Sequence, residues 1–189
     1  MKILIYLLFF FFFFSCQKQK TNIEKKAFDD VFLNTVDSTL IDRRIYLGFN
    51  YSKNQIDSIK KDSSQRIIAI SENLIGITGD DFKKIPENYK IKSDSTWNIQ
   101  PEKFNSPKYL FKKLNSLPVD DSFENWSDKY KTFSGVLCFS HIYFDDNFQN
   151  GIFAVVYSCS IRCEVGYLVY ITKNNKKWRI KTVRKTWLS

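Results

Sequence analysis

His141 is the only histidine of this 189-residue chain, so a Ser-His or Cys-His dyad would have to use it. No nucleophile-elbow motif is present to supply its partner. By strand parity His141 falls with Phe139 and Tyr143, which favours a hydrogen-bonded histidine in the core or at its rim. Asp145 and Asp146 adjoin a predicted turn and lack further acids at ligand spacing, which favours turn capping over paired-carboxylate catalysis or calcium binding. These three are the candidate functional residues, and no catalytic residue is assigned.

Cysteine is the second residue type with reactive chemistry. Cys159 and Cys163 form a C-x₃-C arrangement, whereas redox centres typically use C-x-x-C. A metal site needs more ligands than two cysteines and one histidine, so we expect neither a metal nor another cofactor. Cys138 has apolar neighbours and is predicted to be a small buried hydrophobic residue. The sequence also contains no phosphate-binding loop and no dinucleotide fingerprint.

Residues 1–15 have the pattern of a secretory signal peptide. Lys2 precedes an apolar run of twelve residues, too few for a membrane-spanning helix, which needs about 20. The run ends at Ser15 and Cys16, which resembles the lipobox of bacterial lipoproteins, with Phe13 in place of the usual leucine. Loose lipoboxes of this kind are similar to those of Bacteroidota. The resemblance implies cleavage before Cys16 and lipidation of Cys16; an ordinary signal peptide with a coincidental cysteine is the alternative.

The polar residues 16–26 are predicted to form a lipidated, flexible tether. In the oxidising periplasm a disulfide between Cys159 and Cys163 is expected, although its short loop limits the gain in stability. Surface-exported lipoproteins of Bacteroidota resemble one another in having acids just after the lipidated cysteine, whereas here the first acid is Glu24. We therefore expect an outer-membrane lipoprotein that faces the periplasm and contacts the membrane through its lipid.

The chemistry-bearing residues lie in a predicted antiparallel β-meander over residues 132–188. Its strands are rich in β-branched and aromatic residues and are expected at 132–144, 152–158, 167–172 and from Trp178 onward. Asn-Gly at the end of 145–151 predicts a turn. Both faces of 152–158 are apolar, so this strand should be central and covered on both sides. A slip in the alternation of the last strand predicts a β-bulge near 182–185, or two distinct buried faces.

Upstream elements should position and cover this sheet. Helical spacing predicts a helix at 27–40 with two acids in its first turn, and a second at 107–117 after a Ser-Pro start. Strands are expected at 44–49 and 66–71, with a loop or short helix between them. Trp97, Phe123 and Trp126 should anchor loops on the core. The prediction is a single α+β domain over 27–189, an antiparallel sheet packed by one or two helices.

The net charge of +9 would suit nucleic acid or anionic membranes. However, the lysines are distributed along the chain, in a composition also rich in Asn, Ile, Phe and Tyr. We therefore do not expect a nucleic-acid partner.

Three stretches in the C-terminal half of the chain resemble uncharacterised Bacteroidota lipoproteins. They are residues 139–144, the pattern Cys159…Cys163-x-x-Gly166-Tyr167, and residues 177–180 together with the Trp-Leu-Ser end. The glycines that often neighbour the two cysteines there are replaced here by Ser160 and Glu164. That family carries no known activity, so the resemblance implies no catalytic role.

The function expected from the sequence is that of a membrane-anchored envelope protein that binds or scaffolds a protein partner. An envelope hydrolase or carbohydrate-processing enzyme, and an immunity-type protein that blocks a toxin, are the alternatives. An enzyme should show a polar cleft that contains converging acids or His141, whereas a binding protein should show an apolar, aromatic surface patch.

Overall fold

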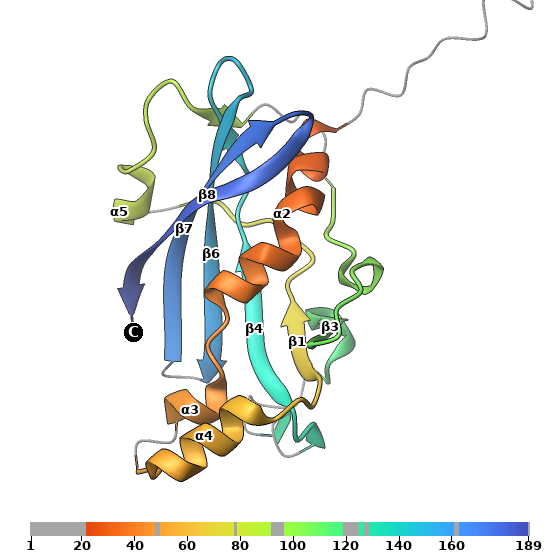
Figure 1. The fold of residues 1–189 in the computed structure, drawn as a ribbon. Coiled ribbons are helices and arrows are strands. Elements are labelled where there is room, and N and C mark those ends of the chain that lie inside the picture. Colours follow the sequence, from red (N-terminus) through yellow and green to blue (C-terminus); the bar gives the residue numbers. More distant parts are fainter. Residues whose placement is uncertain are drawn as a thin grey trace, which may run out of the picture.

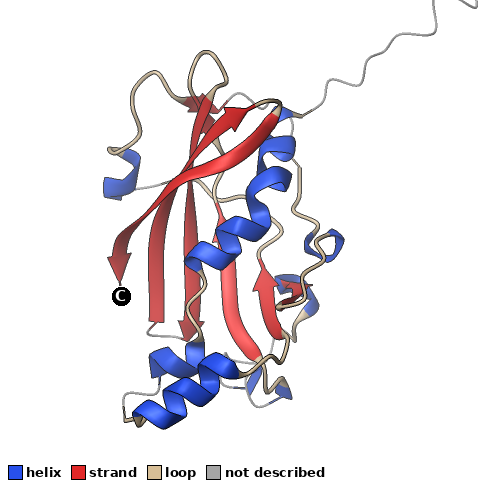
Figure 2. Cartoon of the chain, in the orientation of Figure 1, coloured by secondary structure: helices blue, strands red, loops and turns tan. Residues whose placement is uncertain are grey.

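The computed structural model describes residues 22–47, 50–77, 79–91, 97–118, 125–126, 129–160 and 163–188. One helix, α2 (Ile23–Thr39), lies across one face of an eight-stranded sheet, and two short helices, α3 (Arg43–Leu47) and α4 (Lys53–Lys61), gather at one end (Figures 1 and 2). Smaller elements are α5 (Gly79–Phe82) and the 3₁₀ turns η1 (Pro101–Lys103) and η2 (Leu114–Ser116). The predicted α+β class is confirmed.

The sheet has the order β2-β5-β6-β4-β1-β3, and β7 joins β6 while β8 joins β7. The C-terminal meander is confirmed, with each neighbouring pair antiparallel: β4 (Phe133–Phe139), β5 (Tyr143–Phe144), β6 (Asn150–Ser160), β7 (Cys163–Asn174) and β8 (Lys177–Leu188). The rest of the sheet is mixed, because β1 (Arg66–Ile70) runs parallel to both β3 (Tyr109–Lys113) and β4, while β2 (Lys90–Ile91) pairs with β5.

The predicted strand 132–144 is interrupted at Ser140. The Ser140 hydroxyl accepts the N–H of Ala154 and donates to the carbonyl of His141, so side-chain bonding replaces the ladder there. The predicted Asn-Gly turn is also wrong, since both residues belong to β6. The positive φ of 53° lies at Phe148 instead.

The phase slip in the last strand is confirmed as β-bulges. The pairing of β7 with β8 shifts twice, and each shift leaves one extra residue on β8, Lys181 and Thr186. They flank the predicted range 182–185. Bulges let Trp178 and Val183 both face α2 although their parity differs.

Two upstream predictions are wrong. Residues 44–49 were predicted as a strand, but Arg43–Leu47 form α3, whose start is capped by the carboxylate of Asp42 accepting the N–H of Arg44. Residues 107–117 were predicted as a helix, but Tyr109–Lys113 form β3. Parallel pairing with β1 overrides the local pattern there, and the Ser106 hydroxyl only caps a turn by accepting the N–H of Lys108.

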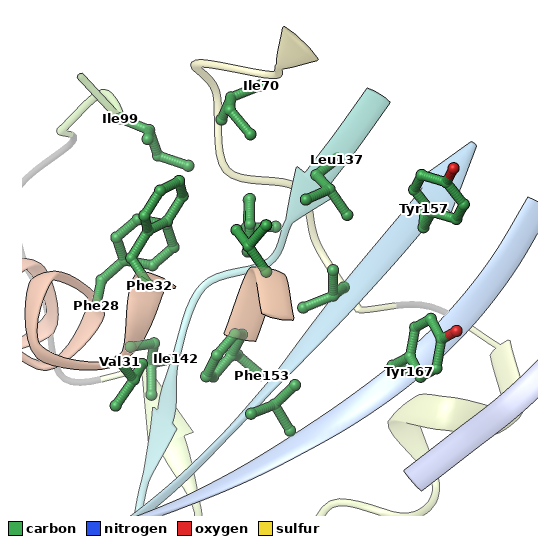
Figure 3. Packing of buried hydrophobic residues seen from close by; sticks show 14 of the residues in the cluster. Phe28, Val31, Phe32, Ile70, Ile99, Leu137, Ile142, Phe153, Tyr157 and Tyr167 are labelled. Atoms are coloured by element: carbon green, nitrogen blue, oxygen red, sulfur yellow. The ribbon is translucent and has the colours of Figure 1, made fainter. Parts of the chain in front are cut away.

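The predicted helix over 27–40 is present but begins earlier. Asn22 caps it by accepting the N–H of Lys25 at 3.1 Å, so residues 23–26 belong to α2 and not to the tether. Glu24, not the pair Asp29 and Asp30, is therefore the acid of the first turn. The helix packs its apolar stripe on the sheet (Figure 3).

The main core lies between α2 and the sheet. Phe28 and Phe32 meet Phe139 there, and Trp97 closes the edge of this cluster with its ring 5.3 Å from that of Phe28, as predicted for Trp97 (Figure 3). The opposite face of the sheet is covered by two smaller clusters, one of which includes Trp126. Strand β6 is therefore covered on both sides, as predicted; Phe123 lies outside the described residues.

Candidate functional site

A cleft of about 540 Å³ lies at the end of the domain that carries α3 and α4. We call it the basal cleft. It opens between the segment after α2, helix α4, the start of β1 and the loop before β3. Its lining is half apolar and half polar: Leu40, Ile45, Ile59, Pro107, Tyr109, Asp42, Lys60, Asp62, Ser63, Ser64, Arg66, Lys108 and Ser134.

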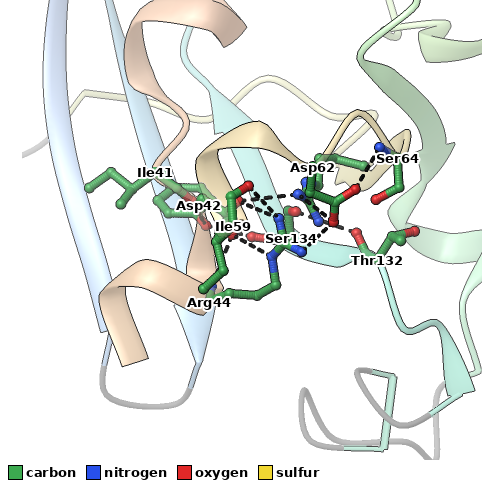
Figure 4. Close-up of polar contacts among 10 residues, drawn as sticks. Ile41, Asp42, Arg44, Ile59, Asp62, Ser64, Thr132 and Ser134 are labelled. Atoms are coloured by element: carbon green, nitrogen blue, oxygen red, sulfur yellow. Dashed lines mark hydrogen bonds and ion pairs between the residues drawn. The ribbon is translucent and has the colours of Figure 1, made fainter. Parts of the chain in front are cut away.

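Two aspartates and two arginines form a closed network on one side of the basal cleft (Figure 4). Arg44 bridges the acids, with Nη2 2.9 Å from Asp42 Oδ2 and Nη1 2.6 Å from Asp62 Oδ2. Arg66 Nη2 lies 3.4 Å from both of these oxygens. The Arg66 side chain is only 10% exposed, so this pairing also satisfies a largely buried cation.

The network holds Asp62 in its ionised form. The backbone N–H of Ser64, and then the Arg44 guanidinium, lower the pKa of the Asp62 carboxyl from 3.8 to about 2. A carboxylate of this kind neither donates a proton near neutral pH nor serves as an effective general base. The acids of the cleft therefore act as fixed charges that orient the arginines.

Two tyrosines fix the walls of the cleft. The Tyr109 hydroxyl donates to Asp37 Oδ1 at 2.8 Å, and burial together with this bond raises the pKa of Tyr109. The Tyr157 hydroxyl reaches the backbone carbonyls of Ile41 and Ser134, and burial raises the pKa of Tyr157. Both hydroxyls thus remain protonated and hold the chain segments that border the cleft.

His141 has a buried partner that the sequence did not indicate. Its Nδ1 lies 3.0 Å from Oε1 of Glu24, and the histidine side chain is 29% exposed. The Glu24 carboxylate is fully buried and also accepts the N–H of Ile142 and the indole N–H of Trp97. The predicted rim histidine is therefore confirmed. Glu24 was missed because it was placed in the tether, although Asn22 is a helix-capping residue type that could have signalled the earlier start.

Asp145 caps its own turn, as predicted. Its Oδ1 accepts the N–H groups of Gln149 and Asn150, and its Oδ2 accepts the side-chain amide of Asn150. Asp146 is exposed in the same turn. Since His141 pairs with Glu24, the three candidate residues have separate partners. Within the described ranges, no group of three or more His, Cys, Asp or Glu side chains could hold a metal ion.

Cys159 and Cys163 are joined as a disulfide pair, with Cα atoms 5.2 Å apart and both side chains buried. The pair closes the β6–β7 connection, and Arg43 Nε donates to the carbonyl of Cys159. Cys138 differs from its prediction, because it is only partly buried among the residues of the opposite face. That burial raises the pKa of its thiol. The cysteines thus form a structural bridge and one separate thiol.

Comparisons of the chain with family models, with curated proteins and with solved structures found no match. In the part of the chain that the structure describes, no helix has the length and apolar character to cross a membrane.

Proposed function

We propose that this chain is an envelope lipoprotein, anchored through Cys16, whose domain binds a protein partner in the basal cleft. The observation that carries the proposal is the position of the cleft. The chain enters the domain at the start of α2, and the basal cleft lies beyond the other end of this helix (Figure 1). The 17 residues of α2 span roughly 25 Å, so the cleft is presented away from the point of anchorage.

The tether between the anchor and the domain is short. Helix α2 is capped at Asn22, and the six residue steps from Cys16 to Asn22 reach at most about 20 Å. A lipid on Cys16 would therefore hold the start of α2 close to the membrane surface. This arrangement supports a protein that works on something in the aqueous compartment beside the membrane.

The chemistry of the basal cleft favours binding over hydrolysis. Its volume is in the range of sites that take a small ligand or an inserted side chain, about 300–1,000 Å³. Ile45 and Ile59 offer apolar contact, while Arg66 is already oriented by its acids, so little ordering is required on binding. Since Asp62 is held ionised, the proton donor that a glycosidase or similar hydrolase needs is not supplied by this carboxyl.

Photo-crosslinking in cells tests the binding site. A photoreactive residue at Lys60, which lines the basal cleft, should yield a discrete crosslinked protein. The same residue at Lys53, which is also exposed on α4 but does not line the cleft, is the matched control. Ile59→Arg should remove the Lys60 product by filling the cleft with a charged side chain. Equal products from both positions, or a product unaffected by Ile59→Arg, would argue against the cleft as the binding site.

Two further measurements test the anchor and the orientation. Cys16→Ala should abolish labelling by radioactive palmitate; labelled Cys16→Ala protein in the membrane fraction would refute the anchor. Because no acid precedes Glu24 in the tether, we propose that the domain faces the periplasm. Protease added to intact cells should then leave the domain intact, and its removal while a periplasmic control survives would assign it to the cell exterior.

A further inference from the structure

Almost all of the net charge lies in one hairpin. Residues 167–189 contain seven Lys and Arg side chains and no acid, whereas residues 1–166 contain 22 basic and 20 acidic side chains. The fold places these cations on the β7–β8 turn and along β8, which pairs only with β7 and so forms an edge of the sheet. We call this surface the basic edge; its cations are Lys173, Lys176, Lys177, Arg179, Lys181, Arg184 and Lys185.

The cations of the basic edge face solvent. All except Lys173, which is partly buried, are exposed, and among the described residues none of the seven forms a salt bridge. Arg184 lies over the ring of Tyr170 at 5.3 Å, which leaves its charge available. The nearest acids of α2 are engaged elsewhere: Asp30 accepts the N–H of Trp178, and Asp29 pairs with Lys25 and Lys103.

The basic edge begins where the chain enters the domain. Figure 1 shows the β7–β8 turn beside the start of α2, and the bond from Trp178 N–H to Asp30 fixes the start of β8 against this helix. An anchor on Cys16 reaches at most about 20 Å from the start of α2. The anchor and the strongest positive surface of the domain are thus at the same end.

We propose that the basic edge docks on anionic lipid headgroups of the membrane that carries the anchor. The inference rests on the proposed lipidation of Cys16, which concentrates one surface, the bilayer, next to these side chains. Each Lys or Arg near an anionic surface strengthens binding by roughly fivefold, so several together fix the domain's orientation. Cations and bulges also protect an edge strand from pairing with other strands, and this protective role requires no lipid. Docking would leave the basal cleft directed away from the bilayer.

The test is a lysine footprint on the full lipidated chain, reconstituted in phosphatidylcholine vesicles with or without phosphatidylglycerol. Lys177, Lys181 and Lys185 should be acetylated at least about fivefold more slowly in the anionic vesicles, and high salt should restore their reactivity. Lys53, Lys61 and Lys83 are exposed lysines remote from the edge and should react equally in both vesicles. Equal rates for the edge lysines in both vesicles would overturn the proposal.

Two additions separate the possible explanations. Replacing Arg179 and Arg184 by Gln should weaken the protection of the remaining edge lysines, whereas Lys61→Gln with Lys83→Gln removes the same charge and should not. Double-stranded DNA added to the neutral vesicles should protect the edge lysines less than anionic lipid does at the same salt; equal protection would overturn a lipid-directed role. Failure of the anchor has a different signature, since the chain would then carry no palmitate and would not associate with neutral vesicles.

Discussion

The imidazole Nδ1 of His141 lies 3.0 Å from the Oε1 of Glu24, although 117 residues separate them in the chain. The same carboxylate accepts the N–H of Ile142 at 2.8 Å and the indole N–H of Trp97 at 3.0 Å. One fully buried side chain in the first turn of α2 thus ties the entry of the chain to the β4–β5 connection and to the loop at Trp97.

Glu24→Ala should destabilise the domain, because it leaves three partners of the carboxylate without their acceptor. A buried donor without a partner costs about 1–3 kcal/mol, so we expect a loss of about 3 kcal/mol in the free energy of unfolding. Glu24→Gln keeps one acceptor oxygen and should lose less. Urea denaturation measures the change, with Glu87→Ala on the exposed surface as the control within about 0.5 kcal/mol. Similar losses for Glu24→Ala and Glu87→Ala would contradict this role.

The basal cleft should make stability depend on acid pH. The N–H of Ser64 and the Arg44 guanidinium lower the pKa of Asp62 from 3.8 to about 2. A carboxyl with a lowered folded pKa stabilises the fold when ionised, so its contribution is complete above about pH 4 and is lost as the pH falls to about 2. Asp62→Asn should flatten the fall in stability over this window in denaturation curves. Asp57→Asn, on the same helix, controls for removing one charge from α4; an unchanged slope in Asp62→Asn would contradict the prediction.

Patterns that extend over several residues and meet one partner were predicted well from the sequence. The meander strands carry long runs of β-branched and aromatic residues, and β6 is apolar on both faces because it is covered on both faces. The helix over 27–40 was found through its apolar stripe. The phase slip in β8 was visible because a bulge changes the alternation of side chains, although its exact positions depend on the pairing with β7.

Short elements and single buried charges were predicted poorly. Residues 109–113 and 43–47 are five-residue runs whose patterns fit a helix or a strand, and pairing with β1 or a cap at Asp42 decided between them. Glu24 looked like a tether residue because its three partners lie between 73 and 118 residues away. The basal cleft joins α4, β1 and the loop before β3, a juxtaposition that local sequence does not encode.

The disulfide should be detectable by alkylation and should contribute modestly to stability. Unreduced, denatured Cys16→Ala protein should be labelled on Cys138 only, because Cys159 and Cys163 are bonded. The bridge closes a loop with a sequence separation of 4, for which chain entropy gives about 2 kcal/mol. Replacing both cysteines by Ser should lower the free energy of unfolding by about this amount. Labelling of three cysteines, read by mass spectrometry, would show that the bridge does not form.

Gly135 is the position in β4 where a side chain should be tolerated least. Its φ of 131° is unfavourable for other residues, and it sits where the pairing of β1 with β4 shifts register. A Cβ there would lie 2.5 Å from the carbonyl oxygen of Ser158 and 2.8 Å from the ring of Tyr157. Tyr157 cannot move freely, since its hydroxyl reaches the carbonyls of Ile41 and Ser134 beside the basal cleft.

Gly135→Ala should therefore cost about 3 kcal/mol or more, through backbone strain and overpacking together. Gly76→Ala is the matched control, because no heavy atom lies within 4 Å of the position that its methyl group would take, and its change should stay within about 1 kcal/mol. Urea denaturation of both variants measures the difference. If Gly135→Ala does not fold, the double variant with Tyr157→Ala, which removes the ring but not the Ser158 carbonyl, should remain at least as unstable. Equal stability of Gly135→Ala and Gly76→Ala would show that β4 accommodates a side chain at the register shift.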